Sequence, residues 1–287
     1  MEIGDNNSAS ILEFLASEAL RKRDYESAAR YFRHLAVHFG IINNESNKRR
    51  FSIKAGECYM QAAEGFGKST KAIMLYFRAT EAFKEGGDLE MARFCGLKMW
   101  EQYLALRENV SRLNSEDIHA FKVAGDHFVS NGNPEKAALI YQDAAERALK
   151  NGKLLLAGGL FKDAGNCNQK LGNHEDASSL YIKAADAFFQ CQEYFEAAWS
   201  YCEAGFLLIR LGRFEEALEL TKRAEESCYK GRIEIFLKDL IRICKLLSQG
   251  HLEDAVENWR RIKAKLSKEY IQLIESSFQS IKSSRKC

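Results

Sequence analysis

The chain has 287 residues, and its 42 Lys and Arg residues nearly balance its 40 Asp and Glu residues, giving a formal net charge of +2. Such a balance argues against a dedicated nucleic-acid-binding protein, which usually has a strong basic excess. The chain contains one proline, although average usage of about 5% would give roughly fourteen. Because proline is excluded from helix interiors, its scarcity favours helices and argues against all-β and loop-rich folds. We therefore predict an all-α protein.

Apolar periodicity and turn residues predict roughly 14 helices joined by short connections. In chain order we expect them at 9–22, 24–39, 46–66, 69–85, 88–107, 115–131, 134–150, 153–171, 173–190, 193–211, 213–230, 233–249, 251–265 and 267–282. Short connections make successive helices antiparallel, so we expect one continuous solenoid over 9–282, with 232–282 as its C-terminal helical cap. Residues 1–8 are expected to form a flexible N-terminus and 283–287 a basic tail.

A repeat of about 40 residues follows the predicted helix pairs. Segments of the form Gly-x-x-Glu-x-Ala begin at Gly132, Gly172, Gly212 and Gly250, with spacings of 40, 40 and 38. Each glycine suits the C-terminal cap of a helix, since it tolerates positive φ. Alanines follow the glycine of each preceding Ala-Gly pair by 12 and 19 residues, and such small residues let two antiparallel helices approach closely. The pattern predicts a right-handed α-solenoid of helix hairpins.

The N-terminal third is less regular. Residues 71–79 match 136–144 closely, and Ala55-Gly56 supplies the partner helix. After Cys95-Gly96 the expected second helix is missing. Two explanations stay open for the region around 107–115: either the inner and outer helix layers exchange there, or one hairpin is degenerate.

The offsets of 12 and 19 resemble the tetratricopeptide repeat, but the period of about 40 exceeds its usual 34. Long-helix repeats of this kind resemble the soluble NSF-attachment proteins (SNAPs), most clearly over 157–171 and 235–259. The resemblance implies a non-enzymatic adaptor that binds SNARE-type helical bundles and recruits an AAA+ disassembly ATPase in vesicle trafficking and membrane fusion. Two segments depart from the family: 21–24 replaces its apolar membrane loop, and the basic 282–287 replaces its acidic, leucine-containing end. The alternative is a generic repeat scaffold that binds a peptide or helix of another partner.

Sequence signals for an enzyme, a cofactor or a metal are weak. Residues 62–69 fit a loose phosphate-loop pattern, but they follow a predicted helix, where that chemistry requires a strand. His34 and His38 are four residues apart, and Leu35 stands where the zinc-protease motif needs glutamate. We expect no enzymatic activity and no cofactor or metal. The eight cysteines form no C-x-x-C pair and are expected to be reduced core residues. No signal peptide or apolar span is evident, so we expect a cytoplasmic protein with at most peripheral membrane association.

Partner binding is the stronger hypothesis. The first helix of each hairpin usually lines the concave face of such repeats, and cations recur on those helices at equivalent positions. An arc of cations would attract an acidic helical bundle, although charges on helices are often only solvated. The candidate partner-binding residues are Lys122, Lys162, Asn166, Lys170 and Arg210, with a second basic cluster of Lys48, Arg49, Arg50 and Lys54. We expect a helical bundle or peptide, SNARE-type in the leading hypothesis, an AAA+ ATPase, and no nucleic acid.

Overall fold

The computed structural model describes residues 3–108, 115–233 and 236–284. These residues form fourteen α-helices and one 3-10 turn, and no strand occurs among them. The predicted all-α fold of antiparallel helix hairpins is confirmed. The chain divides into two compact units, 1–127 and 128–287, within the span that we predict as one solenoid.

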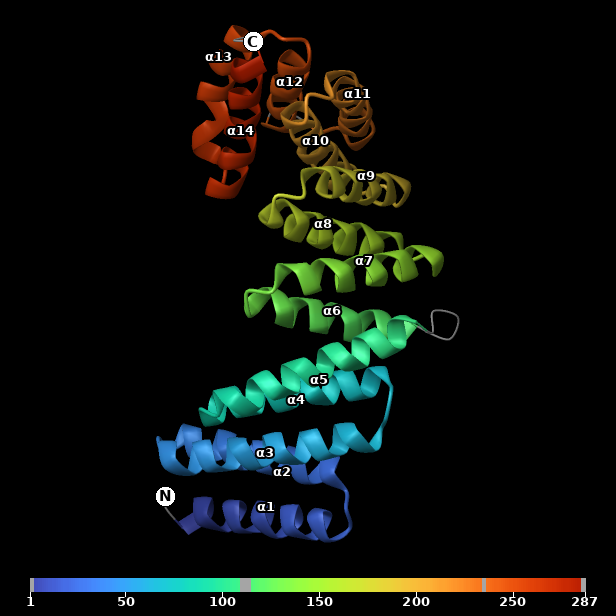
Figure 1. Ribbon diagram of the computed structural model, residues 1–287. Coiled ribbons are helices and arrows are strands. Elements are labelled where there is room, and N and C mark those ends of the chain that lie inside the picture. The colour runs from blue at the N-terminus through green and yellow to red at the C-terminus, as the bar shows by residue number, and fades with distance from the viewer. Residues whose placement is uncertain (1–2, 109–114, 234–235, 285–287) are drawn as a thin grey trace. The chain divides into compact units, whose positions relative to one another are not determined.

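The first unit contains five whole helices and most of a sixth (Figure 1). From α1 to α5, each helix packs against the next one along the chain. Side chains of Asp24, Asn44, Ser69 and Asp88 accept hydrogen bonds from backbone amides and cap helix N-termini. The helices are α1 (Ile3–Arg21), α2 (Tyr25–Ile41), α3 (Glu45–Gly65), α4 (Thr70–Gly86), α5 (Leu89–Arg107) and α6 (Ser115–Ser130), whose last three residues belong to the second unit.

The second unit carries the regular repeats. Its helices are α7 (Pro134–Lys150), α8 (Leu154–Leu171), α9 (His174–Gln190), α10 (Tyr194–Arg210), α11 (Phe214–Gly231), α12 (Phe236–Ser248), α13 (Leu252–Ile262) and α14 (Lys268–Ser284), with the 3-10 turn at Lys263–Lys265. Successive helices pack in pairs from α7 to α13, and α14 then packs against α10 and α12 (Figure 1).

The repeat residues have the roles that their spacing predicts. The four repeat glycines have φ between +71° and +81°, a backbone conformation that side chains disfavour. Ala137, Ala144 and their equivalents are buried between the paired helices. At Gly165 an added Cβ would lie 2.9 Å from the Tyr181 ring, so this glycine permits the close approach of α8 and α9. Asn133 precedes α7, which begins at Pro134, and the Asn133 side chain makes no capping hydrogen bond.

The helix termini differ little from the predicted ones except at the N-terminus. Helix α1 begins at Ile3, inside the segment 1–8 that we expect to be flexible. Residues 109–114 lie outside the described residues, so the layer order around 107–115 stays open. The basic tail lies outside them from residue 285 onward. No helix in the described part of the chain is both long enough and apolar enough to cross a membrane.

Candidate partner-binding site

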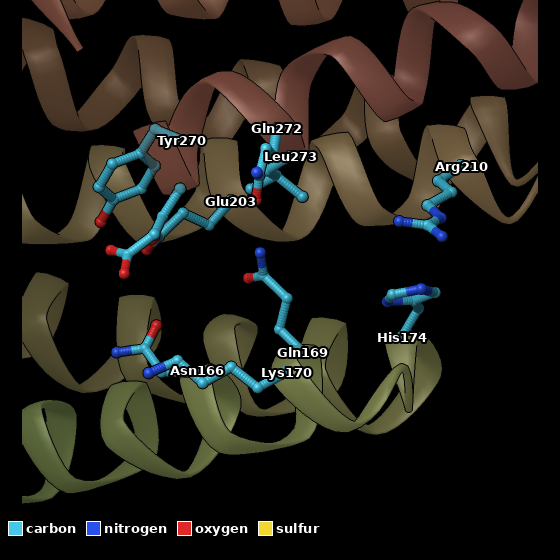
Figure 2. Close-up of a pocket in the computed structure, with 10 residues that line it drawn as sticks. Asn166, Gln169, Lys170, His174, Glu203, Arg210, Tyr270, Gln272 and Leu273 are labelled. Atoms are coloured by element: carbon cyan, nitrogen blue, oxygen red, sulfur yellow. The ribbon is translucent and has the colours of Figure 1, made fainter. Parts of the chain in front are cut away.

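A polar cavity of about 410 Å³ lies within the second unit, where α14 faces α8 and α10. Figure 2 shows its side chains coming from both sides of the gap between these helices. The residues that line it are Asn166, Gln169, Lys170, His174, Glu203, Arg210, Glu269, Tyr270, Gln272 and Leu273. All of its walls are helical, so the site is built on regular elements rather than on loops.

Contacts between α10 and α14 hold together the two cavity walls that these helices form. The Ser277 hydroxyl donates to the Phe206 carbonyl over 2.8 Å, and the Ser280 hydroxyl donates to the Arg210 carbonyl over 3.0 Å. The Trp199 indole donates to the Tyr270 hydroxyl over 2.8 Å, and the two rings meet edge to face. These hydrogen bonds fix the position of α14 along α10, and with it the position of Tyr270 in the cavity wall.

Glu203 provides a buried carboxyl group at one end of the cavity, beside Tyr270 (Figure 2). Its residue is 3% exposed, and its Oε2 atom has no hydrogen-bond partner. Burial raises the pKa of this carboxyl to about 7, while the charge of Lys162 and hydrogen bonds involving Tyr270 and Trp199 act in the opposite direction. A buried carboxyl without a paired cation is costly, so Glu203 is short of one favourable partner.

Arg210 and His174 lie side by side at the opposite end of the cavity (Figure 2). The buried Nδ1 atom of His174 has no hydrogen-bond partner. Burial lowers the pKa of His174, and the Arg210 charge lowers it further, so the imidazole is neutral near pH 7. Within the described chain, no carboxylate forms a salt bridge with Arg210. This end therefore presents a positive charge that is available to an anion.

The floor of the cavity comes from α8. The Tyr181 hydroxyl lies 2.7 Å from the Asn166 Oδ1 atom and 2.8 Å from the Gln169 Oε1 atom. The phenol has one proton, so it donates to one of these two amide oxygens at a time. This pairing holds both amides in place, and Figure 2 shows Gln169 pointing into the cavity between its two ends.

Three of the predicted binding residues meet in this cavity: Asn166, Lys170 and Arg210. Lys162 does not line it, because its ammonium group bridges to Glu196 on α10 at 2.8 Å. Lys122 belongs to the first unit and pairs with Asp126 on its own helix, also at 2.8 Å. These pairs partly neutralise the predicted arc of cations.

The second predicted cluster lies along α3 in the first unit. Lys48 pairs with Glu45 at 3.0 Å. Arg50 lies over the Phe51 ring, and Lys54 lies over the rings of Phe51 and Phe32 at 5.7 and 5.4 Å. Arg49 is exposed. These residues share a helix but no described cavity, and their role in partner binding stays a prediction.

Sequence reasoning missed seven of the ten residues that line the cavity, among them Gln169, His174, Glu203 and Tyr270. One signal was available for Glu203, because it is the only charged residue between Ala197 and Ile209. Tyr270 had no comparable signal, since its place depends on the return of α14 to α10.

The other candidate sites have structural explanations. Residues 62–65 end α3, and the Ser69 hydroxyl caps α4 by accepting a hydrogen bond from the Ala72 amide over 3.1 Å, so this segment connects two helices. His34 is exposed on α2, and His38 lies edge to face with Phe39. Among the described residues, no group of three or more His, Cys, Asp or Glu side chains is arranged to hold a metal ion. Six of the seven described cysteines are buried.

Solved structures with similar helical layouts share little sequence with the chain. A STAND-type signal-transduction ATPase with a tetratricopeptide repeat sensor, from Pyrococcus horikoshii, is 20% identical, with a TM-score of 0.49 over 96% of this chain. The chain spans 42% of that protein's length. Aspartyl phosphate phosphatase F from Bacillus subtilis is 15% identical over 99% of this chain and 72% of its own, with a TM-score of 0.45. A Rap protein complexed with Competence and Sporulation Factor is 13% identical over 97% and 75%, with a TM-score of 0.35.

No curated protein sequence matches the chain. A family model does match, over residues 125–234, which is less than half of the chain but includes α7 to α11 and most of the cavity wall. The matched family is described as the soluble NSF attachment protein, SNAP. The predicted resemblance is therefore confirmed for this segment: the chain is a helical repeat scaffold whose residues 125–234 match the SNAP family.

Proposed function

We propose that the protein is a non-enzymatic adaptor that binds a SNARE-type helical bundle and recruits an AAA+ disassembly ATPase in membrane trafficking. The match of residues 125–234 to the SNAP family carries this proposal. The same segment contains Lys170 and Arg210, two cations that form no salt bridge among the described residues and could meet an acidic bundle. In this role the protein would work in the cytoplasm, associate with membranes at most peripherally, and bind no nucleic acid.

Binding of the purified protein to an assembled SNARE-type four-helix bundle, followed by light scattering at low and physiological salt, tests the proposal. We expect saturable binding that weakens as salt rises. The double variant Lys170→Glu/Arg210→Glu should lose it. We choose this pair rather than Lys122 and Lys162 because each of those two lysines forms a salt bridge. A glutamate in place of either lysine would also repel the acidic partner of that salt bridge.

The control is Lys238→Glu/Arg260→Glu, which changes the net charge equally at two exposed residues of α12 and α13 that form no salt bridge among the described residues. If this control loses binding as fully as the test variant, net charge rather than the cavity region is responsible. Absence of binding by the folded wild-type protein at both salts contradicts the proposal. Stimulation of an AAA+ ATPase on the preformed complex tests recruitment separately.

The cavity itself favours a second candidate, a scaffold that binds a peptide of another partner. Its volume of about 410 Å³ is too small for an α-helix, whose diameter with side chains is about 10–12 Å. A single inserted side chain or chain end would fit. Binding of a short peptide without binding of the bundle would support this function.

A further inference from the structure

We propose that the cavity between α8, α10 and α14 binds one basic residue, with its side-chain cation at Glu203 and its α-carboxylate at Arg210. Such a residue would be an arginine or lysine at the C-terminal end of a partner polypeptide. The inference rests on the second function proposed above, a scaffold that binds a peptide of a partner, since it names what the cavity would recognise in that peptide.

The first support is the pair of unsatisfied atoms at the two ends of the cavity. Glu203 Oε2 and His174 Nδ1 are buried, lack hydrogen-bond partners, and belong to residues that line the same space. Buried polar atoms without partners are uncommon in folded proteins. Two of them around one cavity indicate that a polar group from outside the chain completes the site.

The charges at the two ends specify that group. The carboxyl of Glu203 can pair with an ammonium or guanidinium group, and no described cation forms a salt bridge with it. The guanidinium of Arg210, beside neutral His174, can pair with a carboxylate in the same way. Lys170 and Glu269 also line the cavity and add one charge of each sign, so the complementary ligand carries a cation at the Glu203 end and an anion at the Arg210 end.

The dimensions indicate that both charges belong to one residue. Glu203 and Arg210 are seven residues apart on α10, about 10 Å along the helix axis at a rise of 1.5 Å per residue. Their own side chains reduce the gap that a ligand must span. An extended arginine or lysine can reach from one group to the other, so a single residue suffices to carry both charges.

The interior between the two ends is polar enough for such a residue. Gln169 points into the middle of the cavity and can donate to or accept from the ligand's backbone (Figure 2). The hydrogen bonds of Tyr181 hold Asn166 and Gln169 in fixed positions, which lowers the entropy lost on binding. Leu273 of α14 offers an apolar surface to the ligand's methylene groups.

Isothermal titration calorimetry on the full chain with four probes tests this proposal. The probes are an acetylated tripeptide ending in arginine, the same peptide as its C-terminal amide, the same peptide ending in neutral citrulline, and free L-arginine. We expect the arginine acid to bind, and both the amide and the citrulline peptide to bind at least about tenfold more weakly, since each loses one charge-assisted contact. Equal binding of arginine and citrulline peptides, or no binding of any probe, would overturn the proposal.

Two variants assign the ends of the site. Glu203→Gln should remove the preference for arginine over citrulline, and Arg210→Ala should remove the preference for the acid over the amide. Glu219→Gln and Lys222→Ala, which alter an exposed ion pair on α11, should leave both preferences unchanged. Arg210 is exposed, so its variant tests the site even if Glu203→Gln does not fold.

The remaining outcomes show whether the ligand is the end of a polypeptide or a free amino acid. They also show which of the two proposals, this inference or bundle binding, fails. If free L-arginine binds as tightly as the peptide, the polypeptide source is wrong and the site is one for a free amino acid. If the peptide binds but the SNARE-type bundle does not, this inference stands and the bundle proposal fails. If the bundle binds and none of the four probes does, the bundle proposal stands and this inference fails.

Discussion

The Trp199 indole donates a hydrogen bond of 2.8 Å to the Tyr270 hydroxyl, joining α10 to α14 across 71 residues of sequence. The Tyr270 ring also stands nearly perpendicular to the indole, with centroids 4.7 Å apart. One residue of α14 therefore has both a polar and an aromatic contact with the same side chain of α10. The position of α14, and so one wall of the cavity, depends on this pair together with the Ser277 and Ser280 contacts.

Replacing Tyr270 with phenylalanine should weaken the attachment of α14 while keeping the aromatic contact. The change removes the hydroxyl that accepts the Trp199 hydrogen bond and that also acts on Glu203, at a cost of about 1–3 kcal/mol. Urea denaturation followed by circular dichroism measures the loss, and hydrogen exchange should show faster opening of α14 amides than of α8 amides. Tyr229→Phe is the control, because Tyr229 is 85% exposed on α11. An equal loss in both variants would show that the Trp199 bond is not the cause.

Glu203→Gln should change how stability depends on pH. In the folded protein the pKa of Glu203 is raised from 4.5 to about 7, so folding favours its protonated form. The stability from this group is complete below about pH 4.5 and is lost as pH rises to about 7, a total on the order of 3 kcal/mol. The charged and titratable groups that act on it are Lys162, Glu196 and Tyr270.

The neutral glutamine cannot lose a proton, so its free energy of unfolding should fall by about 3 kcal/mol less than the wild type's between pH 4.5 and 8. Urea denaturation at four or five pH values measures the difference. Glu219→Gln, an exposed change on α11, should follow the wild-type curve. Parallel curves for wild type and Glu203→Gln would mean that the Glu203 carboxyl is already ionised near pH 5.

The helices and their pairing could be predicted from sequence because the signals are local. The caps, the small residues and the 40-residue period each involve neighbours on one helix or on adjacent helices, as at Gly165 and Tyr181. The return of α14 to α10 could not be predicted, because it departs from the repeat and depends on contacts such as Ser277 with Phe206. The cavity was missed for the same reason. Its basic residues were found from their spacing, but its acidic end exists only once α14 covers Glu203.

A further prediction concerns the segment that resembles a phosphate loop. Ser69→Ala should lower stability by about 1 kcal/mol, because it removes the side-chain cap of α4, whereas the exposed Lys68→Ala should change stability by less than about 0.5 kcal/mol. Neither variant should alter nucleotide binding, since we expect none. ATP binding by the wild type that Lys68→Ala abolishes would instead support a nucleotide site.

Two glycines on α8 allow a matched test of close helix packing. In Gly165→Ala the new Cβ would lie 2.9 Å from the ring of Tyr181, which is fully buried and held by Asn166 and Gln169. Because the ring cannot move without breaking these hydrogen bonds, we expect a loss of about 1–3 kcal/mol. Gly159→Ala meets no atom within 4 Å.

Alanine is the better helix former, so Gly159→Ala should leave stability unchanged or raise it by up to about 1 kcal/mol. Thermal and urea denaturation of the two variants, measured side by side, give the sign of each effect. Opposite signs are expected because the same substitution on the same helix differs only in what the methyl group meets. If both variants are stabilised, α8 and α9 are not packed as closely as Gly165 and Tyr181 indicate, and the Asn166–Gln169 floor of the cavity would not be fixed by Tyr181.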